Sequence, residues 1–74
     1  MNLKCGTVVR IIGNSEKLWH YLLIGSIGVV RKEYDKKHII KTVVVEGVSR
    51  NGSPGLYQHV SINDLVAVGK VDVL

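Results

Sequence analysis

The chain contains one cysteine and no long apolar run. Cys5 has no partner for a disulfide within one chain and cannot build a cysteine-based metal site, so we expect a buried or ordinary thiol. No apolar run approaches the ~20 residues of a membrane helix, and the first residues lack the apolar stretch of a signal peptide. These features predict a cytoplasmic protein with no membrane contact.

The residue patterns that usually carry catalysis are also absent. The sequence shows no Ser, His and Asp order of a nucleophilic triad, no Gly-rich phosphate loop and no paired carboxylates. Its histidines, His20, His38 and His59, come from three separate segments, which argues against a metal site. We therefore predict a protein that is not an enzyme and has no metal and no small-molecule cofactor.

Composition predicts one small globular domain spanning residues 1–74. Apolar residues make up 46% of the chain and charged residues 22%, which is enough apolar surface for a folded core. The formal net charge is +4 at pH 7. This excess of positive charge permits an anionic partner such as nucleic acid but does not require one.

Two short β-branched runs bounded by glycines, residues 6–13 and 24–30, organise the N-terminal half. This pattern predicts two strands joined by a loop. The alternation in the first is ambiguous: Val9 and Ile11 can face inward and Val8, Arg10 and Ile12 the other way, and because both sets contain branched apolar residues we expect both faces to be partly covered. Gly25 and Gly28 suit a sharply bent strand entry at which side chains would clash. We expect the second strand to run from Ile27 to about Lys32.

The segment between these runs, residues 16–24, allows two interpretations. One is a short helix that ends at Gly25. The other, which we favour, is a long, partly ordered loop in which Leu22 and Ile24 re-enter the core. In this loop the remaining large side chains are expected nearer the surface: Trp19, His20 and Tyr21.

The rest of the chain reads as strands and turns. The strongest strand signal is the β-branched run at residues 39–46. Asn51-Gly52 favours a tight hairpin turn, and Ser61 can cap one helical turn. In chain order the pattern predicts a charged hairpin tip at 31–37, a strand at 39–46, a turn at 49–55, a strand at 56–60, a helical turn at 61–65 and a last strand from Val66.

The pattern Gly6-x-x-Val9-x-Ile11-Ile12, followed by Gly25-x-x-Gly28-x-Val30, resembles the KOW motif of SH3-like barrels in ribosomal proteins and transcription elongation factors. Residues 61–65 resemble the turn that precedes the last strand of SH3-like folds. The resemblance implies an all-β, five-stranded SH3-like barrel with a short 3-10 turn before the last strand. The connection from Asn14 to Ile24 is longer than in most KOW motifs. The short length of the chain and this long connection together also resemble small phage-encoded accessory proteins.

Two binding functions remain open. The first, which we favour, is association with DNA or RNA, with cations on phosphates and aromatic rings stacked on bases. The second is protein interaction, in which residues 17–23 insert into a component of the transcription or translation machinery. The candidate nucleic-acid-binding residues are Lys17, Trp19, His20, Tyr21, Arg31, Lys32, Lys36, Lys37 and Arg50.

Overall fold

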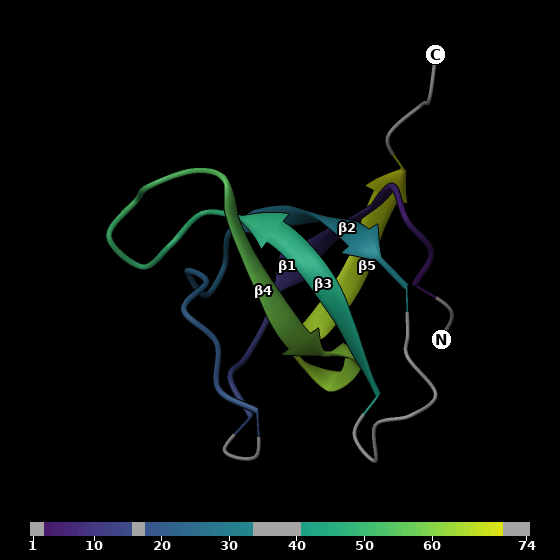
Figure 1. Ribbon diagram of the computed structural model, residues 1–74, viewed down its shortest axis with the longest axis horizontal. Coiled ribbons are helices and arrows are strands. Elements are labelled where there is room, and N and C mark those ends of the chain that lie inside the picture. Colours follow the sequence, from purple (N-terminus) through teal and green to yellow (C-terminus); the bar gives the residue numbers. More distant parts are fainter. Residues whose placement is uncertain (1–2, 16–17, 34–40, 71–74) are drawn as a thin grey trace.

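The computed structural model describes residues 3–15, 18–33 and 41–70, and in them the chain forms one antiparallel five-stranded sheet with the order β4-β3-β2-β1-β5 (Figure 1). The predicted all-β class is confirmed. The elements are β1 (Thr7–Ile11), β2 (Ile27–Lys32), β3 (Thr42–Gly47), β4 (Leu56–Ser61), the 3-10 turn η1 (Ile62–Asp64) and β5 (Leu65–Lys70).

The inner face of the sheet carries the core. Val9 and Ile11 of β1 are fully buried, so of the two faces that the ambiguous alternation offered, theirs is the inner one, while Arg10 and Ile12 are exposed. Aliphatic side chains from every strand contribute to this one core. The buried apolar residues are Leu3, Val9, Ile11, Leu22, Val30, Val43, Val45, Val60 and Leu65.

The sheet is strongly curved, and β1 and β5 lie behind β3 and β4 in Figure 1. Register shifts within the β1–β5 and β2–β3 pairings bend the strands. A Cβ atom at Gly28 would lie 2.6 Å from Val45 Cγ1 and 2.9 Å from the Glu46 carbonyl oxygen, so β2 and β3 lie too close together here for a side chain. Gly28 is therefore a packing requirement, as predicted. The clash predicted at Gly25 is wrong, because a Cβ atom there would meet nothing within 4 Å, and its positive φ of 89° is what favours glycine. β4 and β5 are the outer strands and are connected through η1.

The predicted helical turn before the last strand is confirmed as η1. The Ser61 hydroxyl accepts a hydrogen bond from the Asn63 N–H at 3.3 Å, so Ser61 is the expected cap. β2 has the predicted bounds, and β4 and β5 differ from prediction by one residue. Residues 34–37 of the predicted hairpin tip and 39–40 of the predicted strand lie outside the described residues.

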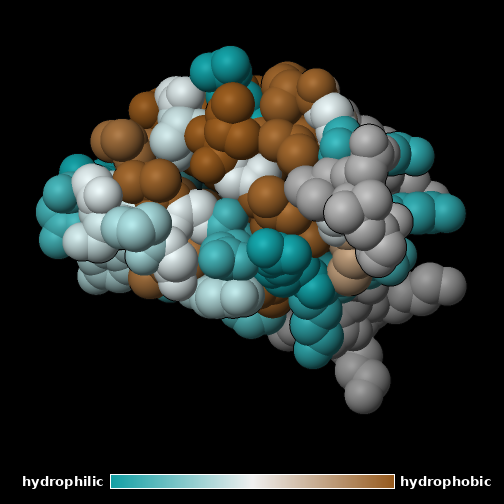
Figure 2. Space-filling model, turned by 90° about the horizontal axis from the view of Figure 1, so that it is seen from above, coloured by the Kyte–Doolittle hydropathy of each residue, from teal (hydrophilic) through white to brown (hydrophobic). Residues whose placement is uncertain are grey.

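Many apolar side chains remain on the surface, and Figure 2 shows them gathered over much of one side of the molecule. The prediction that Ile24 re-enters the core is wrong, since 46% of it is exposed. Gly25 follows it with φ of 89° and bonds through its N–H to the Ile11 carbonyl, which leaves Ile24 on the outside of the turn into β2. The exposed large apolar residues are Ile12, Trp19, Tyr21, Leu23, Ile24, Ile27, Tyr57, Val66 and Val68.

No helix among the described residues is long and apolar enough to span a bilayer.

Candidate functional site

The connection between β1 and β2 is pinned to the segment after β3. The Leu23 N–H donates to the Val48 carbonyl at 2.9 Å, and the Arg50 N–H donates to the Tyr21 carbonyl at 3.0 Å. Leu22 forms an isolated bridge with Ser49 and is fully buried. The described part of this connection is thus a loop docked on the sheet, and the predicted return of Leu22 to the core is confirmed.

His20 holds the loop from inside, so the prediction that it lies near the surface is wrong. Its side chain is fully buried. The Leu22 N–H donates to Nδ1 at 3.2 Å, and Nε2 lies 2.8 Å from the Gly13 carbonyl oxygen, to which it donates as the N–H of the neutral ring. The loop turns back on itself here, and its buried backbone groups need partners that the imidazole supplies. His20 is therefore a structural residue and not a contact for a ligand.

Asn14 completes the anchoring of the same turn. Its Oδ1 accepts from the His20 N–H at 3.1 Å, and its Nδ2 donates to the His20 carbonyl at 3.3 Å. The Ser15 N–H donates to Oδ2 of Asp64, which is buried in η1, at 2.9 Å. Both ends of the described loop are thus fixed by hydrogen bonds to neighbouring elements.

This anchoring presents three exposed side chains together: Trp19, Tyr21 and Arg50, which we call the Trp19 cluster. Trp19 is 49% exposed and Tyr21 58% exposed, and their rings meet edge to face with centroids 4.3 Å apart. The Arg50 Cζ lies 4.5 Å from the centroid of the Trp19 ring, a cation–π contact. One Arg50 Nη atom donates to the His20 carbonyl at 3.4 Å, which fixes the guanidinium beside the ring.

The cluster also rests on β4. The Tyr21 N–H donates to Oε1 of Gln58 at 3.2 Å, across 37 residues of sequence. Sequence analysis missed Gln58 and Asn14 as supports of the site. Local pattern carries no signal for either, because their partners are fixed only when the loop folds against the sheet.

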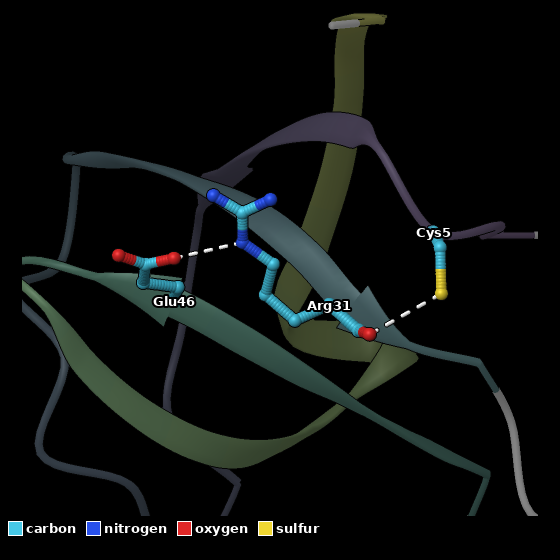
Figure 3. Close-up of polar contacts among 3 residues, drawn as sticks. All are labelled: Cys5, Arg31 and Glu46. Atoms are coloured by element: carbon cyan, nitrogen blue, oxygen red, sulfur yellow. Dashed lines mark hydrogen bonds and ion pairs between the residues drawn. The ribbon is translucent and has the colours of Figure 1, made fainter. Parts of the chain in front are cut away.

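Arg31, another predicted contact, is engaged elsewhere. Its Nε donates to Glu46 Oε1 at 2.7 Å in the ion pair drawn in Figure 3. The hydrogen bond from Arg31, followed by one from Tyr57, lowers the pKa of the Glu46 carboxyl below its usual value of 4.5. The positive charge of Arg31 is therefore partly neutralised by its neighbour on β3.

Cys5 lies beside this pair and is exposed, so burial, one of the two alternatives expected for it, is wrong. Its thiol donates to the Arg31 carbonyl at 3.3 Å (Figure 3). Cys5 belongs to the turn that leads into β1, where Gly6 has φ of 89°, and this turn places it outside the core.

The predicted site is only partly assembled in the structure. Of the predicted cations that the structure describes, Arg50 alone joins the aromatic residues. Lys32 is exposed at the end of β2, on the opposite side of Figure 1 from the docked loop. Lys17, Lys36 and Lys37 lie outside the described residues.

Within residues 3–15, 18–33 and 41–70, no three His, Cys, Asp or Glu side chains gather as they would around a metal ion. The Trp19 cluster is therefore the best-defined concentration of binding chemistry on the described surface: two aromatic rings and a permanent cation on an anchored loop. No protein-family model, curated protein or solved structure matches this chain.

Proposed function

We propose that the protein is a non-catalytic binding module that contacts single-stranded nucleic acid through the Trp19 cluster. The observation that carries the proposal is the contact of the Arg50 guanidinium with the Trp19 ring at 4.5 Å, beside the exposed Tyr21 ring. Aromatic rings stack on unpaired bases, and an adjacent arginine can bind the phosphate that follows. A duplex offers few such bases, and only at its ends, so single strands are the preferred ligand.

The net charge of +4 supports this proposal because it attracts a polyanion over long range. Lys32 and Arg31, at the far end of β2, are peripheral contacts that only a longer strand reaches. The strand order β4-β3-β2-β1-β5 and η1 before β5 support the proposed likeness to SH3-like, KOW-containing domains.

A protein partner of the transcription or translation machinery is the second candidate. It is favoured by Leu23, which is 40% exposed and follows the aromatic residues on the same loop. Tryptophan, tyrosine and arginine are also the residues that dominate protein interfaces. Salt dependence separates the candidates, because release of counterions weakens nucleic-acid binding steeply.

The test is fluorescence anisotropy with labelled DNA and RNA oligonucleotides of roughly six nucleotides, within the site sizes of small β-barrel domains. Trp19→Ala should weaken binding by about 1–3 kcal/mol, or roughly 5- to 150-fold. Arg50→Gln should make the negative slope of log affinity against log salt shallower by about 0.7 between about 50 and 200 mM salt.

Lys70→Gln is the matched control, since it removes one exposed positive charge from the end of β5. It should leave the affinity within about twofold, because a charge beyond the contact is screened. Absence of binding at low salt would refute the nucleic-acid proposal. Binding that falls equally with Lys70→Gln and Arg50→Gln would show charge attraction without a site.

A further inference from the structure

The outer face of β1, β2 and β5 carries a second concentration of exposed side chains. Arg10 of β1 lies directly opposite Ile27 of β2 and Val66 of β5 in the sheet register, so the three side chains share one face. Ile12 follows Arg10 by two residues. Ile24 precedes Gly25, whose carbonyl accepts a hydrogen bond from an Arg10 Nη atom at 3.0 Å. We call these five residues the outer aliphatic face.

The four aliphatic side chains of this face are substantially exposed. The exposed fractions are 51% for Ile12, 46% for Ile24, 48% for Ile27 and 41% for Val66. Isolated exposed aliphatic residues are common on proteins, but neighbouring ones that form an apolar patch beside polar residues are typical of an interaction site.

The charge of this face specifies its ligand. Arg10 is the cation of this face, β1, β2 and β5 contain no acidic residue, and Arg31 of β2 is already paired with Glu46 of β3. The hydrogen bond to the Gly25 carbonyl fixes the Arg10 guanidinium beside the turn that carries Ile24. A planar guanidinium held in this way is suited to bind a carboxylate through two parallel hydrogen bonds.

We propose that the outer aliphatic face binds a protein segment in which aliphatic side chains flank a single carboxylate. The segment's aliphatic side chains would pack on Ile27, Val66 and Ile12, and its carboxylate would pair with Arg10. This docking site is separate from the Trp19 cluster and does not depend on the proposed nucleic-acid function. If both hold, the protein joins a nucleic acid to an acidic partner.

Two other occupants fit the face less well. A second copy of the chain, centred on this face by a twofold axis, would bring two Arg10 guanidinium groups together, and like charges at an interface oppose association. Nucleic acid would gain one cation here and no ring to stack on, because the neighbours of Arg10 are aliphatic. An acidic protein segment satisfies both the charge and the apolar surface.

The experiment selects binders from a displayed library of random peptides of roughly twelve residues, which extend to about 40 Å and can span the sheet. Enriched peptides are synthesised, together with versions in which each Asp or Glu is replaced by Asn or Gln. Affinities are measured for the wild type, Ile27→Thr, Arg10→Gln and Arg10→Lys. Tyr57→Thr, on the outer strand at the opposite side of the sheet, and Lys32→Gln are the matched controls.

We expect enriched peptides that combine aliphatic residues with an acidic one. Ile27→Thr, Arg10→Gln and the loss of the peptide's acid should each weaken binding about tenfold. Arg10→Lys should recover part of the loss, while Trp19→Ala and both controls leave the affinity within about twofold. Unchanged urea midpoints of the exposed-site variants verify that they are folded.

Three results would overturn the proposal. The first is an absence of enriched peptides, or enriched peptides that bind Ile27→Thr and Arg10→Gln as well as the wild type. The second is a concentration-dependent dimer in analytical ultracentrifugation that Ile27→Thr abolishes, which would assign the face to a second copy. The third is a loss of oligonucleotide affinity in Arg10→Gln as large as in Arg50→Gln, which would assign it to nucleic acid.

Discussion

Replacing His20 by phenylalanine tests whether the docked loop depends on the buried imidazole. Phe fills a similar volume but makes neither hydrogen bond of the His20 ring, so the Leu22 N–H and the Gly13 carbonyl lose their partner. A buried backbone group without a partner costs about 1–3 kcal/mol, so the two together cost about 2–6 kcal/mol. A 74-residue domain has a free energy of unfolding of roughly 4–11 kcal/mol. The substitution should therefore remove a large part of the stability.

Urea unfolding followed by far-ultraviolet circular dichroism measures this loss without relying on the neighbouring Trp19. With an m-value of about 1 kcal/mol per molar urea, a loss of 2 kcal/mol lowers the midpoint by about 2 M. His59→Phe is the control, because His59 is exposed on β4 and its replacement should change the stability by no more than about 0.5 kcal/mol. Equal, small changes in both variants would refute the structural role of His20.

Two further predictions concern the sheet. Gly28→Ala should lower the free energy of unfolding in urea by about 1–3 kcal/mol, because its Cβ would overlap Val45 and the Glu46 carbonyl. Gly69→Ala, whose Cβ meets nothing within 4 Å, should lower it by less than about 1 kcal/mol. Equal effects of the two substitutions would contradict the close approach of β2 and β3. The pKa of the Glu46 carboxyl is lowered from its usual value of 4.5, so the ionised carboxylate stabilises the fold above pH 4.5. This stabilisation is lost as the pH falls through the lowered pKa. The difference in unfolding free energy between the wild type and Glu46→Gln should therefore shrink on acidification from about pH 6 to about pH 2, and a constant difference would contradict this reasoning.

The strands could be predicted from the sequence because the local pattern of residues determines them. β-branched runs bounded by glycines gave β2 its bounds, and the Ser61 cap gave η1. Gly28 was identified as a point of close approach between strands because only a residue without a side chain fits there.

The loop was predicted less well because its side chains are placed by long-range contacts. His20 was expected nearer the surface of the loop, with Trp19 and Tyr21, but the backbone of the turn needs its ring nitrogens. Ile24 was expected in the core on apolar character alone, whereas the positive φ of Gly25 sets its direction. The pairing of Arg50 with Trp19, across the docked loop, could not be read from either segment by itself.

The most direct test of the proposed function is a proton–nitrogen correlation NMR titration of the protein with a short single-stranded oligonucleotide. We expect the largest shifts on the Trp19 indole N–H and on the amides of Tyr21 and Arg50, with the amides of Arg10 and Ile27 unchanged. Largest shifts at Arg31 and Lys32, or an unshifted Trp19 indole at saturating oligonucleotide, would contradict the proposed function.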